Sequence, residues 1–421
     1  MSGIVQSNIL RSSGVIAVSA AGLNWSDTII TGSTLTAVAG NGYWINTTSN
    51  TCTITLPSSA EKGDQIVFID YLRTWGTNKI IIDSNGLNYQ GNDDTYTVEY
   101  NTDGQSLNIV YSDATNGWIP LDDDASADEP VPPPTQKGIF AFGTTGSKVS
   151  MSNLVNSSGV IATDVSGVGT ARSYIAATSY GTDKAIFGYG TTGSAVSMTN
   201  LVNNSGVVAT DVSGVGTARF GICAAPYGVG LAIFGYGRTS GVSEVSMTNL
   251  VNNVGVVGTD VSGVGTARSQ GIAVGYGTDK AIFGYGYAGG GSSLTNLCNN
   301  VGVVSADVTG VGTARYNLAA TSYGGDKALF GYGYAGGEAS MTNLVSNTGV
   351  VSTDVSGVGT TRSALGGVGY GGDKGIFAYG YNSGAVSMSN LVSNVGVVAS
   401  DVTGVGTARY YLAGAGYSIS A

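Results

Sequence analysis

The chain of 421 residues contains no histidine, few charged residues (10%) and only three cysteines. Because histidine is the commonest general base and zinc ligand, its absence excludes the histidine forms of serine and cysteine catalytic triads. Cys52, Cys223 and Cys298 lack the paired spacing of a disulfide framework or a CxxC metal site. We expect them to be buried apolar side chains, and we expect no cofactor and no metal.

Positive charge and long apolar runs are also scarce. The net charge is −10, and no basic face could neutralise phosphates, so we expect no nucleic acid partner. No run approaches the roughly 18 apolar residues of a membrane span, so we expect no membrane insertion. The opening MSGIVQSNILRSSGVIAV lacks the basic region and apolar core of a secretory signal, so we expect any extracellular role to be reached without one.

Glycine is abundant, with 68 residues against seven prolines, and no collagen-like period is present. Valine, threonine, serine, asparagine and tyrosine are plentiful while lysine and glutamate are sparse, which is the composition of strands rather than helices. We therefore predict an all-β protein in which the glycines mark turns and close strand packing.

Three segments follow one another along the chain. Residues 1–121 are non-repetitive, with alternating strand candidates such as DQIVFIDY and SLNIVYSD and the turn sequences SNG, TDG and TNG, which favour hairpins. They predict a small β-sandwich or β-barrel-like module. Residues 122–136 contain DDDASADEPVPPP, whose like charges and prolines predict a semi-rigid acidic linker.

Residues 137–421 repeat one unit six times, an apolar strand such as AIFGYG, then NL, then a segment such as DVSGVGTAR. In the second unit RSYIAATSY, KAIFGYG, VSMTNLV and VVATDV each read as a strand. A period in the forties with four short strands predicts blades of a six-bladed β-propeller. The array starts with a second strand and ends with a first strand, so residues 410–417 should pair beside residues 138–143 and close the ring.

Two charged residues recur in every unit, eight positions apart. A metal-binding or anion-binding ring is one interpretation; the favoured one is structural, with the carboxylate capping backbone amides and the guanidinium tying neighbouring blades. GxGxxG matches at Gly188 and Gly284 are not dinucleotide sites, because they end a strand rather than begin a helix. The recurring residues are Asp164, Arg172, Asp211, Arg219, Asp260, Arg268, Asp307, Arg315, Asp354, Arg362, Asp401 and Arg409.

Differences between the units gather just after the arginine and just after FGYG. Since the two strands concerned are antiparallel, both sets should lie at the same end of the ring. Tyrosine on a rigid scaffold is typical of a recognition surface, although drift in exposed loops would give the same variation. The candidate binding residues are Tyr174, Phe220, Arg238, Gln270, Tyr287, Tyr316, Tyr334, Tyr381, Tyr410 and Tyr411.

The unit resembles a kelch repeat in its apolar strand ending in FGYG or FAYG and in the arginine that opens the innermost strand, but it lacks the usual tryptophan and the strict double glycine. Tandem units of the type DKAIFGYG, MTNLV and GVGTAR look like those of bacteriophage virion proteins, especially tail fibres. The segment from Gly40 to Asp124 is similar to a small β module of phage tail and fibre proteins.

The resemblance implies a non-enzymatic structural protein at the virion surface, a tail fibre or spike. Its N-terminal module would contact other virion proteins, as a homotrimer, and its propeller would bind a host-surface glycan or protein. A head decoration protein or a cellular kelch-like adhesin or scaffold are the alternatives. A polysaccharide-degrading enzyme is disfavoured, because glycosidases need one pair of carboxylates about 5–9 Å apart and the aspartates here recur identically.

Overall fold

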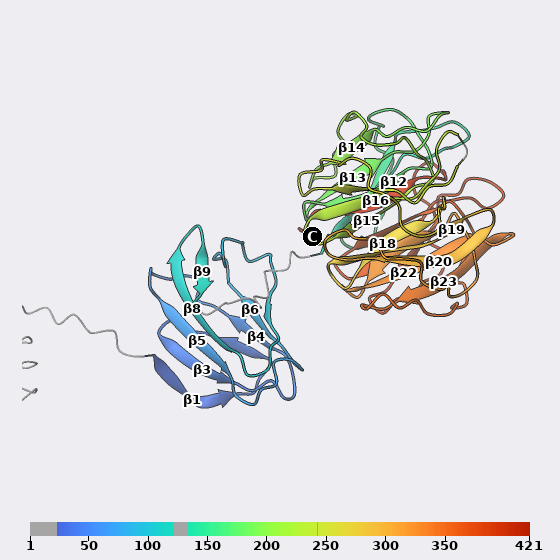
Figure 1. Cartoon of the computed structure of the whole chain (residues 1–421). Helices are drawn as coiled ribbons and strands as arrows, with labels where there is room; N and C mark the ends of the chain where they lie inside the picture. Colours follow the sequence, from blue (N-terminus) through green and yellow to red (C-terminus); the bar gives the residue numbers. More distant parts are fainter. Residues whose placement is uncertain (1–22, 122–133, 242) are drawn as a thin grey trace, which may run out of the picture. The chain divides into compact units, whose positions relative to one another are not determined.

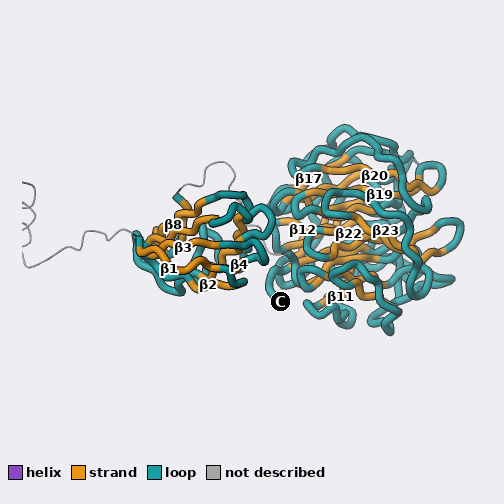
Figure 2. Tube along the Cα trace, turned by 90° about the horizontal axis from the view of Figure 1, so that it is seen from below, coloured by secondary structure: helices purple, strands orange, loops and turns teal. Residues whose placement is uncertain are grey.

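The structure is a computed structural model that describes residues 23–121, 134–241 and 243–421. These residues form strands, turns and loops and no helix (Figure 2), so the predicted all-β class is confirmed. The chain divides into two compact units, Met1–Pro132 and Pro133–Ala421. The opening segment MSGIVQSNILRSSGVIAV and most of the expected linker lie outside the described residues.

The first unit contains two sheets, and the chain passes repeatedly between them (Figure 1). The five-stranded sheet has the order β1-β3-β5-β8-β9 and the four-stranded sheet the order β2-β4-β6-β7. The strands are β1 (Asn24–Ile30), β2 (Thr34–Thr36), β3 (Asn41–Ile45), β4 (Cys52–Thr55), β5 (Gln65–Asp70), β6 (Ile80–Asp83), β7 (Val98–Tyr100), β8 (Ser106–Asp113) and β9 (Gly117–Pro120).

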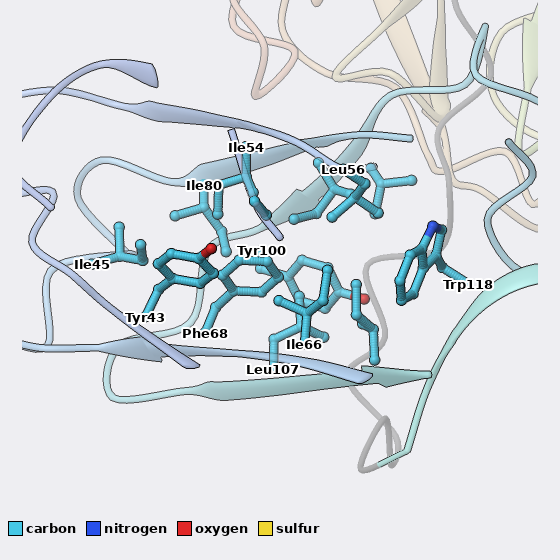
Figure 3. Close-up of a cluster of buried hydrophobic side chains, with 14 of the residues drawn as sticks. Tyr43, Ile45, Ile54, Leu56, Ile66, Phe68, Ile80, Tyr100, Leu107 and Trp118 are labelled. Carbon is cyan, nitrogen blue, oxygen red and sulfur yellow. The ribbon is translucent and has the colours of Figure 1, made fainter. Parts of the chain in front are cut away.

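Alternating side chains of both sheets meet in one core. Tyr43 and Phe68 of the five-stranded sheet face Ile54 and Ile80 of the four-stranded sheet, and Trp118 lies at one end (Figure 3). This is the period-2 alternation read in the sequence, in which every second residue of a strand points to the same face. The two sheets therefore bury one face each and leave one face each outside.

Of the three turn sequences that predicted hairpins, only one joins two consecutive antiparallel strands through a short turn. TNG joins the antiparallel strands β8 and β9. SNG begins a long connection between β6 and β7, and TDG leads from β7 into the other sheet. The pairs β1–β3, β3–β5, β2–β4 and β4–β6 are parallel, because consecutive strands belong to opposite sheets.

The second unit consists of six three-stranded antiparallel sheets. Their orders are β11-β10-β27, β12-β13-β14, β15-β16-β17, β18-β19-β20, β21-β22-β23 and β24-β25-β26. The strands are β10 (Lys137–Ala141), β11 (Ser152–Val155), β12 (Ala176–Tyr180), β13 (Lys184–Gly188), β14 (Thr199–Val202), β15 (Cys223–Tyr227), β16 (Leu231–Gly235), β17 (Thr248–Val251), β18 (Ile272–Tyr276), β19 (Lys280–Tyr287), β20 (Gly291–Cys298), β21 (Ala319–Tyr323), β22 (Lys327–Tyr334), β23 (Glu338–Val345), β24 (Gly366–Tyr370), β25 (Lys374–Ala378), β26 (Ser389–Val392) and β27 (Ala413–Tyr417).

The predicted fourth strand of each unit is not a regular strand. In the second repeat Val208 and Val212 form single bridges to Val202 and Thr199 of β14. The Asn203 side chain accepts hydrogen bonds from the amides of Ser205 and Val207 and holds a tight turn there. Between the two bridges the Ala209 amide donates to the Leu201 carbonyl at 2.8 Å, while Val207 stays exposed.

The predicted pairing of the two ends of the array is confirmed. β27 pairs antiparallel with β10, with Tyr417 opposite Lys137 and Ala413 opposite Ala141. The first strands of successive sheets contact one another in order, and β27 contacts both β24 and β12. The contacts among the six first strands therefore form a closed cycle.

Candidate functional site: an aromatic face over buried arginines

A fully buried arginine opens every repeat of the second unit. Arg315 donates from Nε to the Tyr332 carbonyl at 2.8 Å and from an Nη to Asn343 Oδ1 at 2.6 Å, both in its own sheet. Its guanidinium lies 4.5 Å from the centroid of the Tyr285 ring of the preceding sheet. All six arginines make this cation–π contact, at 4.2–4.9 Å. Each arginine therefore joins two neighbouring sheets.

The recurring aspartate makes a second joint between the same sheets. Asp354 accepts a hydrogen bond from the Thr313 amide at 3.0 Å and one from the Thr313 hydroxyl at 2.6 Å. Asn343 donates to its other oxygen at 2.9 Å. Thr313 belongs to the loop arriving from the preceding sheet, so the carboxylate fastens that loop to its own sheet. The same set across the two ends of the array joins Thr407 to Asp164.

Electrostatics agree with these contacts. Burial alone would raise the pKa of Asp354, but hydrogen bonds from Thr313 and Asn343, together with the charge of Arg315, lower it below its ordinary value. The other five recurring aspartates behave in the same way. Burial lowers the pKa of Arg172 to about 10, and Asp211 opposes that shift. The recurring aspartates and arginines therefore use their charges in contacts between neighbouring sheets.

The contact between arginine, aspartate and the neighbouring loop also requires the second glycine of the recurring GVG sequence. At Gly312 φ is +75°, and a Cβ there would lie 2.4 Å from Asp354 Oδ1 and 2.6 Å from Asn343 Nδ2. Only glycine avoids both the left-handed penalty and this clash. The sequence GVGTAR is therefore the local condition for the arginine–aspartate joint.

Two residues after each arginine, the chain forms a closed cycle of six backbone hydrogen bonds. Each of these residues donates its amide to the carbonyl of its counterpart in the preceding repeat, over 2.7–3.0 Å. Each also has a positive φ, between 52° and 60°. The six are Tyr174, Gly221, Gln270, Asn317, Ala364 and Tyr411, and we call them the six-residue ring.

Residues such as tyrosine and glutamine seldom adopt the positive φ that is found in the six-residue ring. Non-glycine residues adopt it at a cost of roughly 1–3 kcal/mol, and such strain gathers at functional sites. Here the hydrogen-bonded cycle holds it in place. The ring is a rigid frame whose backbone is fixed while its side chains differ.

Aromatic side chains surround the six-residue ring. Tyr174 stacks on Tyr411 at 3.6 Å between centroids, and the contacts continue from Tyr411 to Tyr410 at 5.1 Å and from Tyr410 to Tyr381 at 5.2 Å. Phe220 contacts Tyr174 at 5.9 Å. A second group is centred on Tyr316, with Tyr287 at 5.5 Å and Tyr334 at 5.3 Å. The Asn317 amide reaches the Tyr411 hydroxyl at 3.4 Å and links the groups.

We call these eight residues the tyrosine face: Tyr174, Phe220, Tyr287, Tyr316, Tyr334, Tyr381, Tyr410 and Tyr411. Each is half-buried. Bridges pair the two sets of positions that vary between repeats, for example Tyr316 with Tyr334 and Phe220 with Arg238. The structure thus brings together residues that are far apart in the sequence, at one end of the second unit.

Arg238 and Gln270, the remaining candidates, lie beside this face. Arg238 Nε is 3.7 Å from a Glu244 carboxylate oxygen, and both side chains are partly exposed. Gln270 is a member of the six-residue ring. Burial and neighbouring tyrosines raise the pKa of Tyr316, and burial raises that of Tyr411. These two phenols therefore stay neutral at physiological pH, and the face offers aromatic rings and hydroxyl groups.

Sequence reasoning missed Gly221, Asn317 and Ala364 of the six-residue ring. They lack the aromatic side chain that marked the other positions, and the candidates mixed the first and second positions after the arginine. Counting two residues from every arginine would have found all six. The asparagine and the glycine fit the left-handed backbone, since both residue types adopt it readily.

Among residues 23–121, 134–241 and 243–421, no three histidine, cysteine, aspartate or glutamate side chains are grouped so that they could hold a metal ion. In the same part of the chain no helix is long and apolar enough to cross a membrane. No protein-family model matches the chain, and no curated protein matches it in sequence.

Proposed function

We propose that the second unit is a six-bladed β-propeller and that its tyrosine face binds a glycan or protein of a host cell surface. Six three-stranded sheets, the closed cycle of first strands and the β10–β27 pairing support this architecture. The segment that follows the third strand of each sheet, and that bridges to it at single residues, completes each blade. The chain acts by binding, as a non-enzymatic structural protein.

The observation that carries this proposal is the clustering of eight half-buried aromatic rings over the six-residue ring. Tyrosine presents a large, stiff surface with a polar tip, so it loses little conformational entropy on binding. Neutral rings and hydroxyl groups suit the apolar faces and hydroxyl groups of a saccharide, and the same surface suits a protein loop. The backbone hydrogen bonds of the six-residue ring keep the binding geometry fixed.

We further propose that the chain is a virion surface protein of a bacteriophage, a tail fibre or spike, attached to the particle through its first unit. Support comes from the resemblance of the near-identical tandem units and of the segment from Gly40 to Asp124 to phage fibre proteins. Negative-stain imaging of purified particles with an antibody to the second unit tests this location. Antibody on cell surfaces and absent from particles would instead indicate a cellular adhesin.

Binding is tested with the labelled full-length chain on bacterial cells and on purified bacterial surface polysaccharides. Tyr316→Ala and Tyr410→Ala should each weaken binding about fivefold or more, as expected of aromatic contact residues. Lys280→Ala, at the opposite end of β19 from Tyr287 of the tyrosine face, is the matched control and should bind as the unaltered protein does. Equal binding by all three variants would show that the tyrosine face varies without a binding role.

A further inference from the structure

One pair of facing residues recurs at the tyrosine-face end of every sheet of the second unit. The first member is a position that varies between repeats, and the second member stands opposite it across a turn. Facing residues of an antiparallel pair put their side chains on the same side, with Cβ atoms about 4.5–5.5 Å apart. We call these the hairpin pairs: Thr144–Lys148, Thr191–Ala195, Arg238–Glu244, Tyr287–Gly291, Tyr334–Glu338 and Tyr381–Ala385.

Two of the hairpin pairs carry the same carboxylate, but only one of them supplies a cation for it. In the third repeat Arg238 Nε lies 3.7 Å from a Glu244 carboxylate oxygen. In the fifth repeat Tyr334 stands where that arginine would be, opposite the half-buried Glu338. The Glu338 carboxylate makes no hydrogen bond or ion pair with any residue that the structure describes. The fifth repeat therefore presents half of an ion pair whose other half is present in the third.

Glu338 also lines an open groove of about 720 Å³, which lies between the β22–β23 turn and the loop of residues 354–357. The other carboxylate that lines the groove, Asp354, is already engaged, because it accepts hydrogen bonds from Thr313 at 2.6 Å and from Asn343 at 2.9 Å. No lysine or arginine is among the lining residues. Within this groove Glu338 is therefore the carboxylate that is left to bind a positive charge from outside the chain.

An aromatic ring accompanies this carboxylate. Tyr334 faces Glu338 in the strand register, and the Tyr334 ring lies 5.3 Å from that of Tyr316 between centroids. An ammonium group placed between a carboxylate and the face of a tyrosine ring gains a charge-assisted hydrogen bond from the first and a cation–π contact from the second. The pair Tyr334–Glu338 thus fits a ligand that carries a positive charge.

The walls of the groove favour an amino sugar over a lysine side chain as the source of that charge. A lysine carries its ammonium group on a stem of methylene groups, which is buried best along apolar surface. An amino sugar carries the ammonium group on a ring covered with hydroxyl groups, which match small polar walls. Half of the residues that line the groove are serine, threonine or glycine, namely Gly336, Gly337, Ser340, Ser356, Gly357 and Thr361.

We propose that Glu338 determines specificity by binding the ammonium group of an amino sugar in the host-surface glycan, with the Tyr334 ring against the same group. This inference rests on the proposed binding role of the tyrosine face and names part of its ligand. In the third repeat Arg238 fills the equivalent place from within the chain. Among the six hairpin pairs, only that of the fifth repeat joins an aromatic ring to a carboxylate.

Binding of two labelled oligosaccharides to the full-length chain, followed by fluorescence anisotropy, tests this inference. One is a tetramer of β-1,4-linked glucosamine, and the other is its fully N-acetylated form, which carries no charge. At pH 6, where amines are protonated, the unaltered chain should prefer the glucosamine tetramer about tenfold. Glu338→Gln should reduce this preference to about twofold or less, because it removes the charge. Tyr334→Arg should do the same, because it supplies an internal cation as Arg238 does.

Asp326→Asn is the matched control. Asp326 precedes Lys327, at the opposite end of β22 from Tyr334. The substitution changes the net charge by the same amount as Glu338→Gln, so it shows how much of the preference comes from the general attraction of a chain of net charge −10 for a polycation. This variant should keep the tenfold preference. Unchanged melting temperatures show that the variants are folded.

Equal affinity for both oligosaccharides, binding of neither, or the same loss of preference in Asp326→Asn as in Glu338→Gln would overturn the inference. So would tighter binding of a trilysine peptide than of the glucosamine tetramer, because the charge would then come from a protein. The proposed function fails on a different result, which is unaltered cell binding by Tyr316→Ala and Tyr410→Ala. If those two variants bind cells weakly while the unaltered chain shows no preference for the amine, the tyrosine face keeps its role and only the part assigned to Glu338 is wrong.

Discussion

Closure of the second unit can be tested with one pair of matched substitutions. Tyr417, in the last strand, is 3% exposed, and its ring packs against Gly206 in the turn of the next sheet. Tyr323 is 5% exposed and packs in the same way against Gly396. If the cycle is closed, Tyr417→Ala and Tyr323→Ala remove equivalent contacts, although one lies at the chain end and the other in the middle of the array.

The expected magnitude follows from burial. Truncation of a fully buried aromatic side chain to alanine costs about 3–5 kcal/mol, and the lower end applies here because a tyrosine hydroxyl keeps some access to water. For a unit of this size about 1 kcal/mol lowers Tm by about 2 °C. Both variants should therefore lower the Tm of the second unit by about 6 °C.

Differential scanning calorimetry of the full-length variants measures this, with Val207→Ala as a control, since Val207 is 61% exposed. If Tyr417→Ala shifted Tm by less than 2 °C while Tyr323→Ala shifted it by about 6 °C, the last strand would not support the fold and the closed cycle would be wrong. In that case deleting residues 410–421 should also leave Tm unchanged. In a closed unit the same deletion should abolish the cooperative transition at the Tm of the unaltered chain.

Three further outcomes are expected. Gly312→Ala should cost about 3 kcal/mol or more because it adds a clash with Asp354 to its φ of +75°, whereas Gly336→Ala, with φ of +87° and open space around it, should cost only about 1 kcal/mol; urea unfolding followed by circular dichroism distinguishes them. The recurring aspartates have lowered pKa values in the folded state, so their contribution to the free energy of unfolding is fully present above about pH 4–5 and is lost as pH falls through the folded pKa values. Tm measured from pH 6 to 2.5 should therefore fall in the acidic part of that range, and Asp354→Asn should make the fall shallower. A flat profile would contradict the aspartate hydrogen bonds between sheets. Burial raises the pKa of the Cys223 and Cys298 thiols to about 12, so a disulfide reagent at pH 8 should leave both unmodified in the folded chain and label both in denaturant; rapid labelling of the native chain would show that they are accessible.

The repeat, the all-β class and the β10–β27 pairing could be predicted because they depend on local pattern and on phase. The irregular fourth segment could not, because Asn203 and Gly206 form a turn after which the segment makes single bridges at Val208 and Val212 and no continuous ladder. The parallel pairs of the first unit were also missed. A turn sequence such as TDG predicts a change of chain direction, but it does not determine whether the next strand joins the same sheet.

The candidate site was predicted in part for a similar reason. Differences between repeats pointed to the tyrosines, and the bridges between Tyr316 and Tyr334 and between Tyr410 and Thr144 show how the two sets of positions meet. The hydrogen-bonded cycle was invisible, because backbone carbonyls and amides leave no mark in a sequence. Its one trace is a position where asparagine and glycine appear among other residue types, at Asn317 and Gly221.

The cycle explains why the side chains of the six-residue ring, which include Tyr174 and Tyr411 of the tyrosine face, can vary while the rest of the repeat does not. The six-residue ring is held by main-chain groups, so it accepts glycine at 221, alanine at 364 and tyrosine at 411 with the same hydrogen bonds. The arginine, the aspartate and the glycine of GVGT have no such freedom, because each fills a contact that only that residue makes. Stability and surface chemistry are therefore carried by different positions of one repeat, and a change on the tyrosine face should alter binding far more than it alters Tm.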